Sequence, residues 1–143
     1  MIRVLFLCIH NSARSQIAAE YLKKFGGDNF QVESAGLEPG KLNPLAIVVM
    51  KEDGIDISGN QVNDVFDYFK EGRLYNYIIT VCDEASAQRC PIFPSVHKKI
   101  QWSFEDPASF EGTYDEKLEQ TRTVRDKIKE TIKDFIKNVP EYE

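Results

Sequence analysis

The stretch from residue 2 to residue 22, IRVLFLCIHNSARSQIAAEYL, decides the fold. It opens with a short continuous apolar run, Ile2 to Leu7, which is typical of a strand buried on both faces of a parallel sheet. A mostly polar loop follows at residues 9–13. Apolar residues then recur at helical spacing until Gly26 and Gly27 end the pattern. The stretch therefore predicts a strand, a loop and a helix in succession.

Strands and helices are predicted to alternate along the rest of the chain. Further strands are expected at residues 30–35, 77–81 and 99–103, and helices at 44–54, 62–70 and about 115–138. Such alternation predicts an α/β fold, here a four-stranded parallel sheet flanked by helices on both faces, with right-handed crossovers. Because the sequence has no repeat, linker or low-complexity segment, we expect residues 1–143 to form a single domain.

The composition is that of an ordinary globular protein and excludes several classes of function. The net charge of −5, without a long basic run, argues against nucleic-acid binding. No apolar stretch approaches the ~20 residues of a membrane span, and the first apolar run is too short for a signal peptide. We therefore expect a soluble, cytoplasmic protein whose three cysteines are thiols. The two histidines and scattered cysteines lack zinc spacing, so no metal is predicted.

The loop after the first strand has the features of an oxyanion cradle. Backbone N–H groups at the start of a helix bind tetrahedral anions, and Cys8 lies at the base of this loop. The helix dipole, the loop amides and Arg14 all favour the thiolate form of this cysteine. Arg14 can also grip two oxygens of the anion in a bidentate manner. The residues expected to bind the oxyanion are Ile9, His10, Asn11, Ser12, Ala13, Arg14 and Ser15.

With its CIHNSARSQ core, the segment from Val4 to Tyr21 resembles the low-molecular-weight tyrosine phosphatase superfamily and, within it, the arsenate reductases. The resemblance implies a thiolate nucleophile at Cys8 and a fold of four parallel strands flanked by helices. Two departures separate the chain from the phosphatases of that superfamily. Ala13 stands where they carry a second loop cysteine, and Ala108 and Ser109 follow the Asp-Pro pair where they carry aromatic residues.

The segment WSFEDPA, residues 102–108, is a candidate general-acid loop. An Asp-Pro pair taken alone indicates only a turn. The whole segment resembles the general-acid loop of the superfamily, which implies that Asp106 protonates the leaving oxygen. The resemblance also implies that Ser34 hydrogen-bonds Asn11, so that Asn11, Ser15 and Ser34 brace the cradle.

Two further cysteines distinguish the branches of the superfamily. Taken alone, Cys82 is as consistent with core packing as with chemistry, and Cys90 with a surface thiol. However, the segment CDEASAQRCPIFP, residues 82–94, resembles the redox segment of thioredoxin-coupled arsenate reductases. That resemblance implies a relay in which Cys82 attacks Cys8, Cys90 attacks Cys82, and an external dithiol such as thioredoxin reduces the final disulfide. It implies no bound cofactor.

Two other functions remain open at the level of the sequence. A phosphatase would use Cys8, Arg14 and Asp106 and would make Cys82 and Cys90 irrelevant, and phosphate or sulfate would compete with arsenate for the same cradle. A domain that only binds oxyanions or senses redox state would turn over neither arsenate nor a phosphate ester. Replacing Cys82 separates the first two, because only a reductase would lose turnover.

Overall fold

Four parallel strands form the centre of the molecule. The computed structural model describes residues 1–82, 88–94 and 96–139. The strands are β1 (Ile2–Cys8), β2 (Phe30–Gly36), β3 (Tyr77–Thr80) and β4 (Lys98–Gln101), and their order in the sheet is β2-β1-β3-β4. All three neighbouring pairs are parallel, so the carboxyl ends of the strands meet at one edge of the sheet. In such sheets that edge is where ligands bind.

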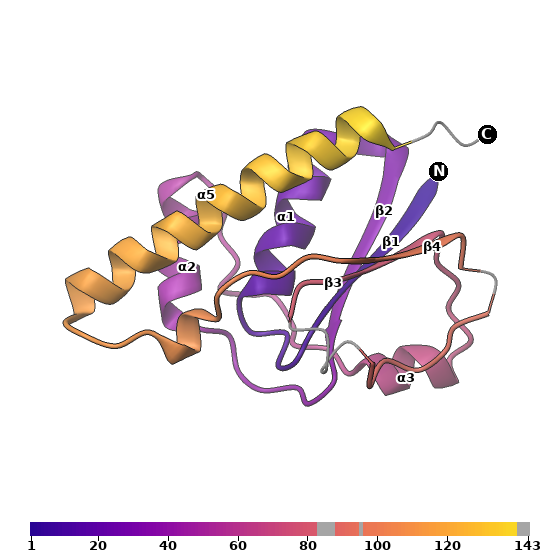
Figure 1. Ribbon diagram of the computed structural model, residues 1–143, viewed down its shortest axis with the longest axis horizontal. Coiled ribbons are helices and arrows are strands. Elements are labelled where there is room, and N and C mark those ends of the chain that lie inside the picture. The colour runs from indigo at the N-terminus through magenta and orange to yellow at the C-terminus, as the bar shows by residue number, and fades with distance from the viewer. Residues whose placement is uncertain (83–87, 95, 140–143) are drawn as a thin grey trace.

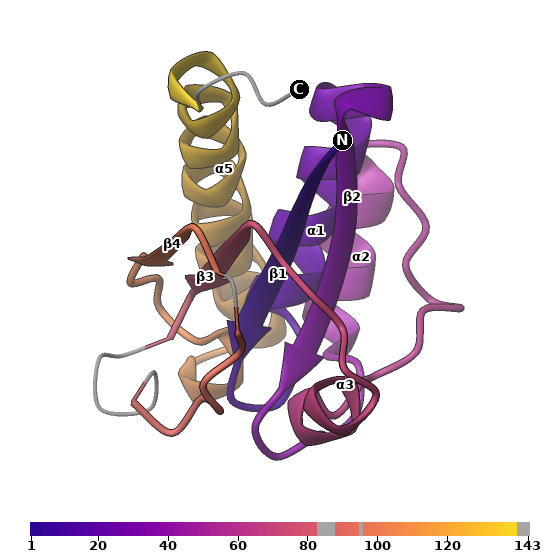
Figure 2. The same cartoon turned by 90° about the vertical axis from the view of Figure 1, so that its right-hand side faces the viewer.

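Helices cover both faces of this sheet. Helices α1 (Arg14–Gly26), α2 (Pro44–Glu52) and α5 (Tyr114–Asn138) pack on one face, and the short helix α3 (Val65–Lys70) lies on the other (Figures 1 and 2). Two 3₁₀ turns, η1 (Gly27–Asn29) and η2 (Pro107–Ser109), complete the regular structure of the described residues. The predicted fold, a four-stranded parallel sheet flanked by helices on both faces, is confirmed.

The two faces of β1 explain its continuous apolar sequence. Val4 and Phe6 pack in the cluster that includes residues of α1, α2 and α5, whereas Leu5 and Leu7 belong to a smaller cluster on the α3 side. Since successive side chains of a strand point to opposite faces, a strand covered on both sides needs apolar residues at every position. Burial on both sides fixes the place of Cys8, the last residue of β1.

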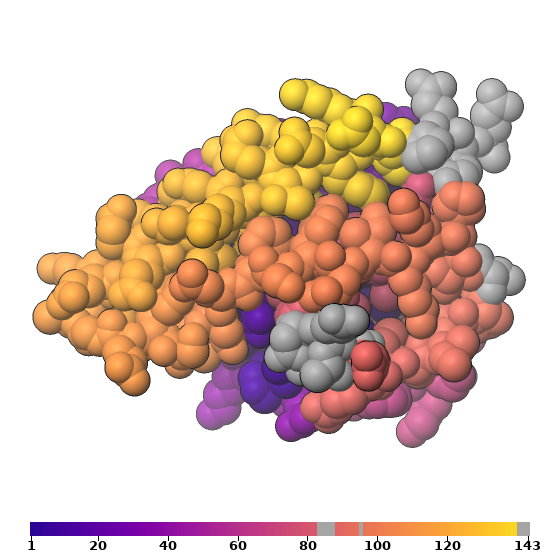
Figure 3. All heavy atoms as spheres, in the orientation of Figure 1, coloured from indigo at the N-terminus to yellow at the C-terminus, as the bar shows by residue number. Residues whose placement is uncertain are grey.

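The long helix α5 closes the larger face. Its buried residues are the ones predicted from their helical spacing: Leu118, Thr121, Val124, Ile128, Ile132 and Phe135. Thr113 caps the helix in a capping box with Glu116, which satisfies backbone groups that the first turn would leave unpaired. Figure 3 shows the segment that follows β4, in orange, lying along the surface next to this helix.

Several predicted boundaries differ from those observed by one to three residues. Helix α3 begins at Val65, three residues later than expected, because the Asp64 carboxylate accepts the N–H of Phe66 and caps the helix there. Strand β4 spans Lys98–Gln101 instead of residues 99–103, although the Trp102 N–H still donates to the Thr80 carbonyl. In the described part of the chain no helix is long and apolar enough to cross a bilayer.

Candidate active site

Every peptide carbonyl of the loop between β1 and α1 is held from outside the loop. The carbonyls of Cys8, Ile9, His10 and Ser12 accept the backbone N–H groups of the segment after β2, and Asn11 accepts the side-chain amide of Gln16. The donors, in the same order, are Leu37, Glu38, Gly40, Asn43 and Gln16, at 3.1, 2.7, 3.1, 2.9 and 3.1 Å.

This outward arrangement of carbonyls orients the N–H groups of the loop. In a trans peptide the C=O and the following N–H point in opposite directions. The N–H groups of residues 9–13 therefore point away from the bracing segment and toward the inside of the loop. There the N–H of Asn11 lies 3.1 Å from the Cys8 sulfur. The loop is thus a ring of inward donors around Cys8, the arrangement that binds an oxyanion.

The Cys8 sulfur is buried and lies in a short hydrogen-bonded chain. The side-chain amide of Asn11 donates to the Ser15 hydroxyl oxygen at 2.7 Å, and that hydroxyl lies 3.0 Å from the sulfur. Because the Ser15 oxygen already accepts from Asn11, its hydrogen is available to the sulfur. With the N–H of Asn11, two donors face the sulfur.

Asn11 holds the strained position of the loop. Its φ of 54° lies in the left-handed region, which asparagine tolerates better than most residues. Its carboxamide oxygen accepts the N–H of Asn63 at 2.9 Å and the Gln16 amide at 3.3 Å. Asn63 in turn donates to the Ser34 backbone carbonyl at 3.0 Å. The expected direct bond between Ser34 and Asn11 is wrong, because among the described residues Asn63 lies between them.

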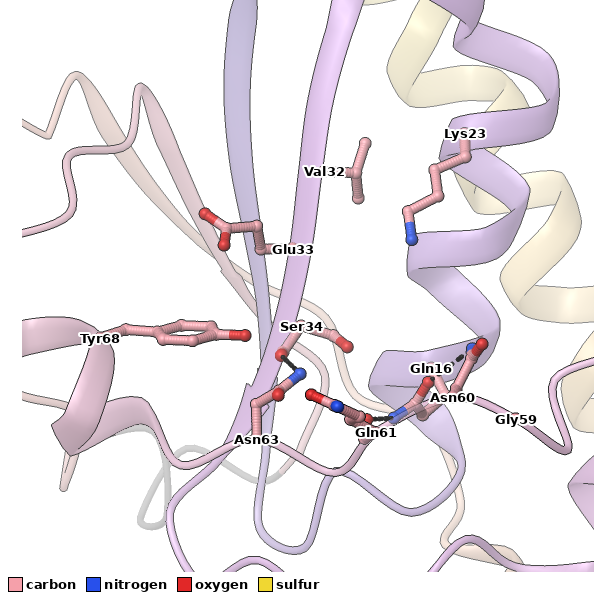
Figure 4. A pocket seen from close by; sticks show the side chains of 10 residues that line it. All are labelled: Gln16, Lys23, Val32, Glu33, Ser34, Gly59, Asn60, Gln61, Asn63 and Tyr68. Atoms are coloured by element: carbon pink, nitrogen blue, oxygen red, sulfur yellow. Dashed lines mark hydrogen bonds between the residues drawn. The ribbon is translucent and has the colours of Figure 1, made fainter.

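A second layer of polar residues lies behind Asn11. Figure 4 shows Asn63 beside Ser34 at the end of β2, and Asn60 and Gln61 beside Gln16 on α1. These side chains line a cavity of about 380 Å³ along the outer edge of β2. Gln16 is buried, donates to the Gln61 carbonyl at 3.0 Å and accepts from Asn60 at 3.1 Å. The cradle is therefore braced on this side by residues 60–63.

Gly36, the last residue of β2, lets this segment approach the cradle closely. A Cβ at Gly36 would lie 2.8 to 2.9 Å from backbone atoms of Ile9, His10 and Asn11. Such distances are shorter than any ordinary contact of a side chain, and backbone atoms cannot move aside cheaply. The glycine is required by the close packing of β2 against the loop.

Arg14 links the cradle to the predicted acid. Its guanidinium is buried, donates to the Phe104 carbonyl at 3.3 Å, and lies 3.5 Å from the Asp106 carboxylate. The other carboxylate oxygen of Asp106 accepts the N–H of Ala108 at 3.0 Å and caps η2. The structure thus brings Cys8 and Arg14, which flank the loop after β1, and Asp106, which follows β4, to one edge of the sheet.

Cys82 comes two residues after the end of β3, the strand next to β1. The N–H of Val81 donates to the Leu7 carbonyl at 2.9 Å, so the end of β3 continues beside the end of β1. Cys82 is buried and belongs to the same core cluster as Cys8. Its carbonyl accepts the side-chain amide of Gln101 at 2.6 Å. Cys82 therefore packs in the core, as expected for a structural cysteine. It also lies at the carboxyl edge of the sheet near Cys8, as expected for a cysteine of the relay.

Cys90 packs on the opposite face of the sheet. It is half-buried against the cluster of Leu5, Leu7 and Ile78, and its thiol donates to the Pro91 carbonyl at 3.3 Å. Burial raises the pKa of this thiol, and the Lys99 ammonium lowers it. All three cysteines are free thiols. Residues 83–87, between Cys82 and Cys90, lie outside the described residues.

Comparison with known proteins assigns the chain to a family. Residues 3–142 match the family model of the low molecular weight phosphotyrosine protein phosphatases. The chain belongs to this family. An arsenate reductase of Bacillus licheniformis is 46% identical over 134 residues, which are 92% of this chain and 93% of the relative. The similarity to this arsenate reductase agrees with the resemblance to arsenate reductases seen in the sequence.

Comparison with solved structures extends this agreement to three dimensions. An arsenate reductase in the phosphate binding state matches 98% of this chain and 100% of its own, with a TM-score of 0.77 at 32% identity. A thioredoxin-dependent arsenate reductase of Corynebacterium glutamicum matches 93% of this chain and 62% of its own, with a TM-score of 0.63 at 29% identity. Both share the parallel sheet described above.

Several residues that support the site were not found from the sequence. Gln16 has a signal in retrospect, because a glutamine on the apolar side of a helix requires a buried partner. Asn63 and Gln101 have none, because their contacts join segments 52 and 19 residues apart. Among the described residues no group of three or more histidine, cysteine or acidic side chains lies close enough to hold a metal.

Proposed function

We propose that this chain reduces arsenate to arsenite with Cys8 as the nucleophile and Cys82 and Cys90 as a thiol relay. The observation that carries the proposal is the position of two buried thiols, Cys8 and Cys82, at the ends of neighbouring strands. A phosphatase needs only the first of these thiols, whereas a two-electron reduction by cysteine needs a second that can attack the first.

The reaction begins in the cradle. Arsenate binds to the inward N–H groups of residues 9–13 and to the guanidinium of Arg14, which lie where a tetrahedral oxyanion needs donors. The Cys8 thiolate attacks arsenic and forms a sulfur–arsenic bond. Asp106 gives a proton to the departing oxygen, which leaves as water. Its carboxylate lies beside Arg14 and so next to the bound anion.

The electrons move in the second step. Cys82, as the thiolate, attacks the Cys8 sulfur and forms a disulfide. The sulfur–arsenic bond breaks, its electron pair stays on arsenic, and arsenite leaves. Cys90 then attacks Cys82, so that the Cys8–Cys82 bond breaks, Cys8 leaves as a thiolate and a Cys82–Cys90 disulfide remains. No bound metal or organic cofactor takes part.

An external dithiol protein closes the cycle. We propose a reductant of the thioredoxin type, in keeping with the thioredoxin-dependent arsenate reductase of Corynebacterium glutamicum. Two electrons pass from its dithiol to the Cys82–Cys90 disulfide. Because the relay starts from three reduced cysteines, the proposal places the protein in the reducing cytoplasm.

The alternative function is hydrolysis of phosphate esters through a cysteinyl-phosphate. The specific observation in its favour is that the cradle selects a tetrahedral oxyanion by shape and charge, which phosphate and sulfate share with arsenate. The related arsenate reductase in the phosphate binding state agrees with this overlap. We therefore expect slow hydrolysis of aryl phosphates, and inhibition of arsenate reduction by phosphate.

One pair of assays separates the two functions. Arsenate reduction is followed with a thioredoxin and thioredoxin reductase system, and hydrolysis of an aryl phosphate is followed in parallel. We expect Cys8→Ser to abolish both activities, and Cys82→Ser and Cys90→Ser to abolish multiple turnover of arsenate only. If Cys82→Ser reduces arsenate as fast as the unmodified protein, the relay is refuted. If arsenate is inert and the ester turns over rapidly, the phosphatase function replaces the reductase.

A further inference from the structure

Lys99 faces the same side of the sheet as Cys90. In the parallel pairing of β3 with β4, Lys99 is opposite Ile78 and Gln101 is opposite Thr80. Residues opposite one another in a parallel pair point to the same face. Ile78 belongs to the cluster against which Cys90 packs. The side chain of Lys99 therefore leaves the backbone on the same face of the sheet as this cluster. Lys98, opposite Tyr77, starts from the other face.

Cys90 and Lys99 line one cavity. It has a volume of about 300 Å³ and lies over β3 and the edge strand β4. Its lining residues are Ile78, Thr80, Gln88, Cys90, Lys99, Ile100 and Gln101. Lys99 is exposed and also lines this cavity. Its ammonium group can therefore stay in solvent while its side chain lies along the cavity wall. Among the charged side chains of the described residues, Lys99 alone lines the cavity with Cys90.

The surroundings of Cys90 otherwise favour the neutral thiol. The sulfur is half-buried in apolar surroundings and donates its hydrogen to the Pro91 carbonyl. Both factors oppose ionisation, since burial disfavours charge and a donated hydrogen must be lost. Only the thiolate attacks a disulfide. The relay therefore requires a nearby positive charge to offset the burial of Cys90.

We infer that Lys99 is the residue that supports the thiolate of Cys90 and so sets the rate at which Cys90 resolves the Cys8–Cys82 disulfide. This inference rests on the proposed relay. In that step the Cys90 thiol gives its proton to water, its sulfur bonds to Cys82, and Cys8 leaves as a thiolate. The exchange is balanced, because one disulfide is broken and one is formed. Lys99 touches no substrate and acts through Cys90.

Among the described residues, the other ionisable groups near Cys90 have partners of their own or carry no charge. Tyr75, in the same cluster, is buried, and burial raises the pKa of its hydroxyl above the ordinary value. On its own segment, Arg89 forms an ion pair with Glu38 at 2.7 Å. On the α3 side, Tyr68 packs against the same cluster, and the Arg73 guanidinium is stacked on its ring. β3 contributes Ile78 and Thr80, which carry no charge. Asp83 and Glu84 lie outside the described residues.

The test measures the ionisation of Cys90 directly. The reduced full-length protein is alkylated with iodoacetamide over a range of pH, and the labelled peptides are quantified by mass spectrometry. Trypsin cleaves after Arg89, so Cys82 and Cys90 fall in separate peptides. We expect Lys99→Met to slow alkylation of Cys90 about two- to fivefold at pH 7, as for the loss of an exposed charge partner. Lys99→Arg retains the rate.

Lys98→Met is the matched control, because it removes the same charge from the adjacent residue on the opposite face. It leaves the alkylation of Cys90 unchanged. High salt, about 1 M KCl, slows alkylation in the unmodified protein and has less effect on Lys99→Met, since salt screens exposed charges. Equal alkylation rates for Lys98→Met and Lys99→Met would refute the inference. Thermal unfolding of each variant verifies that the fold is intact.

A single turnover with arsenate tests the link to the relay. After acid quenching, Lys99→Met accumulates the Cys8–Cys82 disulfide at the expense of Cys82–Cys90, whereas Lys98→Met and Lys99→Arg do not. An unchanged distribution of disulfides, despite slower alkylation, refutes the role of Lys99 in the relay. If the unmodified protein fails to reduce arsenate, the proposed function falls, and the alkylation experiment still decides whether Lys99 supports the thiolate of Cys90.

Discussion

The cradle and the relay segment lie at the same edge of the sheet but are held in different ways. All five carbonyls of residues 8–12 accept hydrogen bonds from other segments, and the Cys8 sulfur faces two donors. In the relay, the Cys82 carbonyl accepts the side-chain amide of Gln101 on β4. Arg89 joins Glu38 in an exposed ion pair, a kind of contact that contributes little stability.

This difference corresponds to two kinds of chemistry. Stabilising a charged oxyanion requires donors that are already in place before the substrate arrives. Passing a disulfide from Cys8–Cys82 to Cys82–Cys90 requires sulfur atoms that change partners, and the thiols now pack on opposite faces of the sheet. We therefore expect substitutions in the cradle to lower both reductase and phosphatase activity, and substitutions in the relay to lower reduction alone.

The largest effect is expected from Arg14→Ala. It removes the buried guanidinium that lies beside both the cradle and Asp106. Loss of a charged, bidentate group that stabilises the transition state lowers rates on the order of 10³-fold. The values of kcat/KM for arsenate and for an aryl phosphate should fall together. Arg14→Lys keeps the charge without the planar fork and should give an intermediate loss. A fall in only one activity would show that the two reactions do not share the cradle.

A smaller but still large effect is expected from Gly36→Ala. The added Cβ would meet backbone atoms of the loop at 2.8 to 2.9 Å, and relieving such overlap costs about 1–3 kcal/mol. We expect a lower melting temperature and a roughly tenfold to hundredfold loss of both activities, because the loop must shift. Gly59→Ala is the control, since nothing lies within 4 Å of its Cβ position. Full activity of Gly36→Ala would mean that the loop tolerates displacement.

Gln101→Leu should separate the two regions. Its amide donates to the Cys82 carbonyl at 2.6 Å and to the Ser103 hydroxyl at 3.0 Å, and among the described residues it forms no hydrogen bond with the cradle. We expect arsenate reduction to fall about threefold to tenfold, as for a misplaced reacting group, and aryl phosphate hydrolysis to be unchanged. Gln120→Leu, another exposed glutamine that binds carbonyls, is the control. A parallel loss of hydrolysis would contradict the independence of the two regions.

The same contrast explains how much the sequence could predict. The cradle is local, because strand, loop and helix follow one another within residues 2–26, and the pattern predicts both its place and the role of Arg14. Its brace is not local: Asn63 meets Asn11 from 52 residues away, where a direct bond from Ser34 was expected. Nothing in the pattern of apolar residues specifies which polar group arrives from a distant loop.

The residues of the proposed relay came from the resemblance of residues 82–94 to a redox segment, and their geometry could not be predicted. The position of β3 beside β1 is compatible with the proposal. The sequence could not reveal that Cys90 packs on the face opposite to Cys8, nor that Lys99 lines its cavity. Both depend on packing between segments far apart in the sequence, such as that of Phe93 against Tyr75 and Phe69.

The smallest effect on activity is expected far from both regions, at Asp53. Its carboxylate accepts the hydroxyl of Tyr21 at 2.7 Å and the ammonium of Lys129 at 2.9 Å, and so ties together the three helices of one face. The hydrogen bond from Tyr21, followed by the one from Lys129, lowers the pKa of Asp53 below its ordinary value. A carboxyl group with a lowered pKa stabilises the fold above its unfolded pKa, about 4, and loses that contribution as the pH falls through the folded value.

Asp53→Asn should therefore lower the free energy of unfolding by about 1 kcal/mol at pH 7, since a charged acceptor becomes a neutral one. The difference from the unmodified protein should shrink as the pH falls below about 4, where the carboxyl is protonated in the unfolded chain. Urea unfolding at several pH values measures it, with Asp134→Asn, exposed on α5, as the control. The ratio of reductase to phosphatase activity should stay constant, because the helix layer supports cradle and relay alike. A changed ratio would mean that the two regions respond differently to the packing of this face.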